Sequence, residues 1–202
     1  MFALVESGSI TKYLKGNQGI QIGDLKYPKA IYTLWTEAER NAIGIYTVEY
    51  DDSNKKDGEW YINTNQSYAF ADNKVTATYG TATAKKHADT LYTQEDEDNG
   101  LGTKDDVKVE GLKTKLIRTV KGQAANELGK TDWYVFRKAD AGTAIPSAVT
   151  THRAAIRTKC GQMETAITNA SDTAALITLY THTEQEDGTL VRPLGEIPIK
   201  YF

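Results

Sequence analysis

The chain has 202 residues and a formal net charge of -3, which excludes the strongly basic composition typical of proteins that bind duplex nucleic acid. Its single cysteine, Cys160, excludes an intramolecular disulfide and therefore a disulfide-stapled secreted scaffold. No apolar run reaches the roughly 20 residues needed to cross a bilayer, and the first ten residues lack the basic start of a signal peptide. We expect synthesis in a reducing cytoplasm.

Residues 1–80 predict a β-rich domain, a small antiparallel meander with one short helix. Ser7-Gly8-Ser9 is a turn signal between apolar and alternating segments, and Asp72-Asn73 offers a two-residue turn. Thr36 and Glu39 have the spacing of a capping box, which predicts a helix that Gly44 ends. The main strand candidates of the meander are residues 45–50, 60–63, 67–70 and 74–79.

Residues 81–104 differ in character from the first 80. The segment is poor in hydrophobic residues, and Glu95 to Asp98 is a run of four acidic residues that glycines follow. Low hydrophobicity with clustered charge is typical of a solvated linker or loop. We interpret this segment as an acidic, glycine-containing linker.

Residues 105–181 predict an antiparallel helical hairpin. In the first helix apolar side chains recur every fourth residue from Leu112 to Leu128, which places them on one face. A helical pattern restarts at Thr131-Asp132-Trp133 and stops at Gly142, a second long helix follows Pro146, and Asp172 is a candidate cap for a further short helix. The apolar face of the second helix comprises Val149, His152, Ile156, Cys160, Met163, Ile167 and Ala170.

The tail, residues 182–202, contains Asp187-Gly188 and predicts a short β-hairpin or an extended segment. Together these segments predict an α+β fold. In it, an N-terminal small antiparallel β meander with one short helix is followed by a C-terminal antiparallel helical hairpin and a short terminal β-hairpin.

Residues that could perform catalysis do not form a recognisable group. The histidines lack the spacing of metal ligands, and His152 lies eight residues from Cys160, roughly 12 Å along a helix. Both are interpreted as packed side chains of a helix face. The acidic loop from Asp51 fails the calcium-loop pattern, because Lys56 stands where a ligand is needed. We expect no catalytic residue, no metal, no cofactor and no enzymatic activity.

Two segments carry a resemblance to known proteins. Residues 131–137 read Thr-Asp-Trp-Tyr-Val-Phe-Arg, and a loop ending at Pro146 leads to Arg153-Ala-Ala-Ile-Arg157. This succession resembles tail-fibre assembly proteins and related virion-associated proteins of tailed bacteriophages. Residues 35–44 are similar to the middle of some marine phage structural proteins. The resemblance implies a hairpin in which Trp133 packs near Ile156 while Arg153 and Arg157 face outward.

The resulting functional prediction is a non-enzymatic structural protein of a tailed-phage virion, made in the host cytoplasm and bound to tail, fibre or neck components. The alternatives are a tail-fibre assembly chaperone and a head decoration protein. We expect a homo-oligomer with protein partners, and no nucleic acid or membrane. The predicted interface residues are Trp35, Tyr46, Tyr50, Trp60, Trp133, Phe136, Val149, Ile156, Met163 and Ile167.

Overall fold

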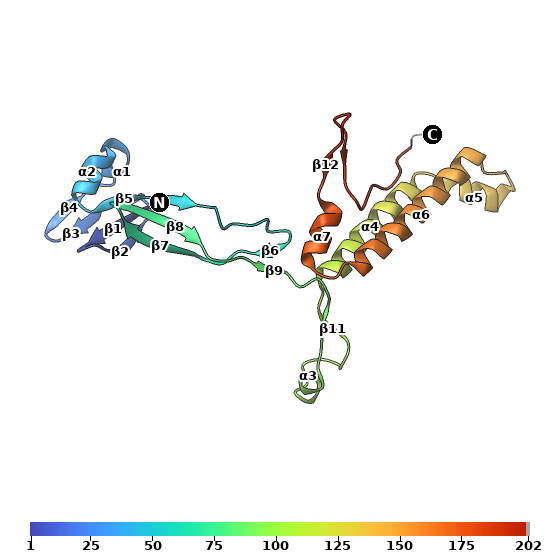
Figure 1. Cartoon of the computed structure of the whole chain (residues 1–202), viewed down its shortest axis with the longest axis horizontal. Coiled ribbons are helices and arrows are strands. Elements are labelled where there is room, and N and C mark those ends of the chain that lie inside the picture. Colours follow the sequence, from blue (N-terminus) through green and yellow to red (C-terminus); the bar gives the residue numbers. More distant parts are fainter. Residues whose placement is uncertain (201–202) are drawn as a thin grey trace. The chain divides into compact units, whose positions relative to one another are not determined.

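The computed structural model describes residues 1–200 and divides the chain into two compact units, Met1–Thr83 and Ala84–Phe202. The first unit is mainly β and the second mainly helical (Figure 1). The predicted mixed α+β class is therefore confirmed. The acidic segment that the sequence predicts as a linker belongs to the second unit, and the last two residues of the predicted tail lie outside the described residues.

The first unit is built on a five-stranded sheet with strand order β2-β1-β5-β8-β7. Its neighbours are antiparallel except for β5 and β8, which are parallel. The elements of this unit are β1 (Phe2–Glu6), β2 (Ser9–Leu14), β3 (Ile20–Ile22), β4 (Leu25–Tyr27), α1 (Ile31–Leu34), α2 (Glu37–Ala42), β5 (Ile45–Asp51), β6 (Tyr61–Ile62), β7 (Gln66–Ala71) and β8 (Lys74–Tyr79), with β9 (Thr83–Ala84) at the unit boundary.

Two tight turns set the register of this sheet. Ser7 and Gly8 have φ values of 51° and 78°, and Asp72 and Asn73 have 50° and 58°. Two consecutive positive φ values define the turn whose twist matches antiparallel strands. The turns place Glu6 opposite Ser9 and Ala71 opposite Lys74, which confirms both predicted hairpins.

Both faces of the sheet carry an apolar cluster, because side chains alternate along each strand. On β1, Leu4 packs with Ile31 and Ile45, whereas Ala3 and Val5 pack with the β5 and β8 side chains on the other face. The sheet also curls. The rings of Tyr13 on β2 and Tyr68 on β7, the two outer strands, lie 4.7 Å apart.

The predicted meander is wrong in two respects. β5 pairs in parallel with β8, from Val48 opposite Val75 to Asp51 opposite Thr78, although the sequence predicts antiparallel neighbours. The predicted strand at 60–63 is shortened to β6, which pairs with β9 and takes no place in the main sheet. The polar loop after Asp51 carries the chain away from β5, so the next strand cannot fold back onto it.

The predicted capping box is present at the start of α2. The Thr36 hydroxyl accepts a hydrogen bond from the Glu39 amide at 3.3 Å, and the Glu39 carboxylate accepts one from the Thr36 amide at 2.7 Å. Gly44 follows the helix with a φ of 80°, and a side chain there would strike the Val5 carbonyl. A second short helix, α1, precedes α2, so the structure has two short helices where the sequence predicts one.

The second unit is organised around helices α4 and α6, which pack against each other along their length. They are antiparallel, since Lys113 near the start of α4 donates to the Thr168 carbonyl near the end of α6 at 2.8 Å. The elements of this unit are β10 (Thr90–Leu91), α3 (Gln94–Asp98), β11 (Val107–Val109), α4 (Leu112–Gly129), α5 (Asp132–Ala141), α6 (Ser147–Asn169), α7 (Thr173–Tyr180), β12 (Thr183–Glu184) and β13 (Leu190–Val191).

The helical hairpin has the predicted apolar seam. Leu116, Val120 and Ala124 of α4 are buried, as are the predicted side chains of α6 from Val149 to Ile167. The Asp172 carboxylate caps α7 by accepting from the Ala175 amide at 2.7 Å. The helical pattern that restarts at Thr131 is confirmed as α5, which lies between α4 and α6 and which Gly142 ends.

Residues 90–109 form a projection that we call the arm. β10 and β11 pair antiparallel and α3 lies between them, at the tip (Figure 1). The acidic segment predicted as a linker or loop contains a short helix here, because Thr93 and Asp96 form a capping box that starts α3. The first long helix also begins later than residue 105, since β11 occupies 107–109 and Gly111 caps α4.

The predicted terminal hairpin is formed by β12 and β13, with Thr183 opposite Val191. Gly188 has a φ of 79°, and the Gln185 amide donates to the Thr189 carbonyl at 2.8 Å. This is a three-residue loop with a left-handed glycine, slightly longer than the two-residue turn that Asp-Gly indicates.

Candidate interaction site

A buried arginine holds the end of α4, the start of α5 and the second turn of α6 together. The Arg153 guanidinium donates to the Leu128 carbonyl at 2.7 Å and to the Thr131 hydroxyl at 2.8 Å, and it lies 2.9 Å from the Asp132 carboxylate. Thr131 is 2% exposed and Arg153 8%. We call these four residues the corner. The hydrogen-bond acceptors and the Asp132 carboxylate compensate the buried positive charge of Arg153, as burial of a charge requires.

The corner gathers the residues that carry the phage resemblance. Thr131 and Asp132 come from the Thr-Asp-Trp segment, and Arg153 is the first arginine of the later pattern. The expectation that Arg153 faces outward is therefore wrong, although Arg157 is exposed. Helical periodicity placed Arg153 beside the apolar stripe, and only the chain turn at Thr131 supplies the acceptors that make its burial favourable.

Helix α5 has no buried residue. Asp132 lies in its first turn, where a carboxylate favours the helix dipole, and Gly142 ends it with a φ of 68°. Trp133 is 51% exposed and Phe136 71% exposed. The Arg137 guanidinium lies 4.4 Å from the centre of the Trp133 ring. We call Trp133, Phe136 and Arg137 the α5 face, since residues three and four apart share one side of a helix.

The α5 face differs from the packing that the resemblance implies. Trp133 contacts Tyr134, with ring centres 4.1 Å apart, and Arg137, whereas Ile156 is fully buried in the seam of α6. Within residues 1–200, Arg137 forms no ion pair with a carboxylate. The α5 face therefore presents two large exposed aromatic rings beside a half-buried guanidinium.

The other predicted interface residues fall into two groups. Tyr50 is 53% exposed, whereas Trp35 and Tyr46 are half-buried, with rings against Tyr27 and Phe70 respectively. The remaining side chains lie inside the chain's own apolar cores and have no surface to offer; these are Trp60, Val149, Ile156, Met163 and Ile167.

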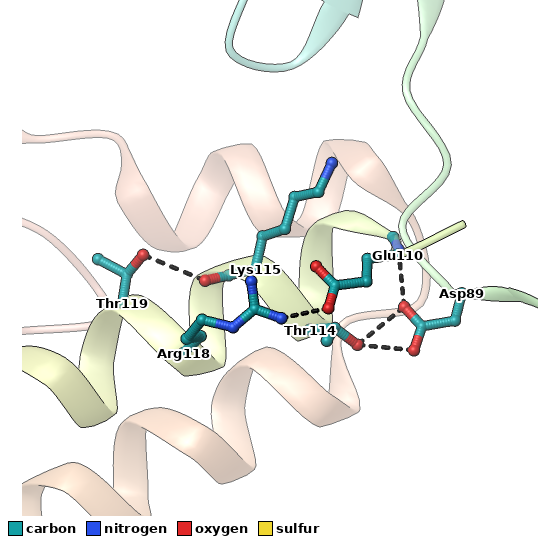
Figure 2. A network of polar contacts seen from close by, with 7 residues as sticks. Asp89, Glu110, Thr114, Lys115, Arg118 and Thr119 are labelled. Atoms are coloured by element: carbon teal, nitrogen blue, oxygen red, sulfur yellow. Dashed lines mark hydrogen bonds and ion pairs between the residues drawn. The ribbon is translucent and has the colours of Figure 1, made fainter. Parts of the chain in front are cut away.

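A second polar network closes the base of the arm (Figure 2). The Asp89 carboxylate accepts from the Gly111 amide at 2.6 Å and from the Thr114 hydroxyl at 2.8 Å. The hydrogen bond from Gly111, and next that from Thr114, hold the pKa of Asp89 below its usual value. Beside it Arg118 pairs with Glu110. Asp89 thus caps α4 from 22 residues away, which sequence spacing does not indicate.

The first amides of α4 have further partners in the same stretch of chain. Leu112 donates to the Lys86 carbonyl at 3.0 Å and Lys113 to the His87 carbonyl at 2.9 Å. The donors that a helix N-terminus normally offers to an anion are therefore already used. This network is a structural clasp that uses the amides of Gly111, Leu112 and Lys113.

His152 and Cys160 are both buried, as their interpretation as packed side chains predicts. The Cys160 thiol donates to the Glu164 carboxylate at 3.3 Å. Burial, and next the Glu164 carboxylate, raise the pKa of Cys160. A thiol with a raised pKa is mostly protonated near neutral pH and is a poor nucleophile.

One pocket of about 360 Å³ lies in the first unit, between the end of β2, the following loop and Tyr32 of α1. It is lined mainly by loop residues, with Lys12 and Lys15 at its rim, and it contains no pair of groups arranged for acid–base chemistry. Among residues 1–200, no three His, Cys, Asp or Glu side chains gather as a metal site would require. The described helices include none of the length and apolarity that a membrane span requires.

Comparison with family models, with curated proteins and with solved structures finds no match to this chain.

Proposed function

We propose that this chain is a non-enzymatic structural protein of a tailed-phage particle that binds a tail or fibre component through the α5 face. The observation that carries the proposal is the corner. Three of the residues in the segments that resemble tail-fibre assembly and virion proteins, Thr131, Asp132 and Arg153, hold the start of α5 in place. Their effect is to hold Trp133 and Phe136 outside the core.

The energetics of α5 favour a role in binding. An isolated helix of ten residues is marginal in water, and α5 buries none of its side chains. Large exposed aromatic side chains with an adjacent arginine are the composition of interface hot spots. A helix held by a buried ion pair while its aromatic side chains stay in solvent is suited to an incoming protein.

The proposal is tested by identifying what α5 touches. A photo-crosslinking amino acid replaces Phe136 in a chain produced during phage infection, and mass spectrometry identifies the crosslinked protein in purified particles. The matched control carries the same group in place of Leu34, a 79% exposed side chain of the first unit. We expect a tail or fibre protein crosslinked at position 136 and none at position 34. Absence of the chain from mature particles and from their precursors overturns the proposal.

A tail-fibre assembly chaperone is the second candidate, and the small size of the α5 face favours it. Stable interfaces bury about 800 Å² on each partner, and two rings with one guanidinium on a single short helix offer less. A transient client contact needs less area. Crosslinks to the fibre protein in infected cells, with the chain absent from mature particles, would assign the chaperone role. Immunogold labelling of the chain on the capsid would assign head decoration instead.

A further inference from the structure

The arm carries apolar side chains that no other described residue of the second unit buries. Leu91 on β10 stands opposite Val107 on β11, and Val109 stands opposite Thr90 across a register shift, so three apolar side chains lie close together on the two paired strands. They are 43%, 49% and 58% exposed. We call these three residues the arm face.

The arm also has polar contacts between its own residues. Lys108 lies 2.6 Å from the Asp96 carboxylate and 5.4 Å from the centre of the Tyr92 ring. The Tyr92 amide donates to the Asp106 carbonyl at 2.9 Å, and the Asp105 amide donates to the Tyr92 carbonyl at 3.0 Å. The arm therefore has a defined shape, and its polar contacts leave the arm face directed at solvent. A two-stranded hairpin is marginal alone and gains stability when its apolar face is covered.

The net charges of the arm and of the helices indicate which surface covers the arm face. Residues 90–109 contain six acidic and two basic residues, a net formal charge of -4. Residues 112–169, which hold α4, α5 and α6, contain ten basic and four acidic residues, a net formal charge of +6. The arm is therefore electrostatically complementary to the helical part of a second copy, and opposite charges of this kind steer and orient association.

The arm cannot reach the α5 face of its own chain through the packing described. Its base is clasped to the start of α4 by Asp89 and Gly111, whereas the corner holds α5 at the end of α4 through Leu128. The 18 residues of α4 separate these sites by roughly 27 Å at 1.5 Å per residue. The two uncovered apolar surfaces thus lie at opposite ends of the helix pair.

We propose that the arm face of one copy docks on the α5 face of the next copy, with the acidic α3 near Arg137 and Lys138. Because the two surfaces differ and lie at opposite ends, the contact is head-to-tail and repeats from copy to copy. This inference rests on the proposed function, because both use the α5 face. Within a run of copies the arm of a neighbouring copy covers that face, and only the end copy of the run presents it to the tail or fibre component.

The first test is sedimentation velocity of the full chain over a range of concentrations, at low and high salt. We expect oligomers that grow with concentration and dissociate in high salt, because salt screens exposed charges. The double substitution Val107→Ser and Val109→Ser, and separately Phe136→Ser, should leave monomers. The control Leu25→Ser with Leu34→Ser removes comparably exposed side chains of the first unit, 63% and 79% exposed, and should associate like the unmodified chain. Circular dichroism checks that every variant is folded.

Mixing the two defective variants gives the decisive result. The arm variant retains an intact α5 face and the Phe136→Ser variant retains an intact arm, so together they should form a one-to-one heterodimer that does not extend. An unmodified chain that stays monomeric, a control that loses association equally, or a mixture without heterodimer would overturn the inference.

The two proposals fail separately. A monomeric chain that still crosslinks through position 136 to a particle protein would end the head-to-tail contact and leave the proposed function intact. A chain that assembles head-to-tail yet is absent from particles and their precursors would end the proposed function and leave the head-to-tail contact intact.

Discussion

Arg153 donates a hydrogen bond of 2.8 Å to the hydroxyl of Thr131, and this contact joins α6 to the turn between α4 and α5. Both side chains are buried. The position of α5 therefore depends on one cation and its three acceptors, and little apolar contact contributes to it.

Replacing Arg153 with Met should destabilise the second unit. The Leu128 carbonyl and the Thr131 hydroxyl lose a charged donor in a buried place, and we expect a loss of about 2–3 kcal/mol, the size of hydrogen bonds to a charged group. Urea denaturation followed by circular dichroism measures it. The matched control Arg157→Met changes an exposed residue four positions on and should stay within about 0.5 kcal/mol of the original. Equal losses in both variants would contradict the assigned role of the corner.

Two glycines of the α4 region should respond oppositely to alanine. A Cβ at Gly111 would overlap the Ala88 carbonyl, whereas nothing lies within 4 Å of a Cβ at Gly122. Gly111→Ala must displace the clasp and should cost about 1–3 kcal/mol, as overpacking does. Gly122→Ala should stabilise the helix by about 1 kcal/mol. Thermal melts of the two variants test this pair, and a stabilised Gly111→Ala variant would show that the clasp yields easily.

The order of the arm should depend on pH through Asp96. Lys108, and next the Thr93 amide, lower the pKa of Asp96 from 3.8 to about 2. A carboxylate with a depressed pKa in the folded state stabilises that state above the unfolded pKa, and the stabilisation is lost as pH falls through the folded value. We therefore expect the contacts of Thr93 and Lys108 to weaken between pH 3.8 and about 2. An NMR titration of the Asp96 carboxyl measures this directly, and Asp96→Asn should abolish the transition. A midpoint near 3.8 would mean that the pair with Lys108 is not formed in solution.

Cys160 should resist alkylation in the folded chain. Its raised pKa and its burial both reduce the thiolate available to iodoacetamide. We expect slow labelling under native conditions and fast labelling in urea, with mass spectrometry as the readout. The substitution Glu164→Gln removes the nearby negative charge and should speed native labelling modestly. Native labelling as fast as that in urea would place the thiol in solvent.

Features that depend on neighbouring residues were predictable from the sequence. The turns at Ser7-Gly8 and Asp72-Asn73, the Thr36 capping box and the buried seam of α6 follow from residue type and spacing. Each is determined by a few consecutive residues or by helical periodicity.

Features that depend on residues far apart in the chain were not predictable from the sequence. The parallel pairing of β5 with β8 joins strands separated by a long excursion, and the Asp89 cap acts across 22 residues. The burial of Arg153 needs acceptors from another helix. In the candidate site, Trp133 and Phe136 are exposed, and their role as interface residues stays a prediction. The seam residues chosen with them were apolar because they form the core, a distinction that periodicity alone cannot make.

Because Asp89 and Gly111 are hydrogen-bonded at the base of the arm, the folding of α4 does not depend on the sequence of the arm. Since the chain enters and leaves the arm at one fixed point, doubling its length would add only about 0.6 kcal/mol of closure entropy. The segment behaves as an interchangeable insert, open to lengthening, shortening or recharging while the helix pair beneath it keeps its shape.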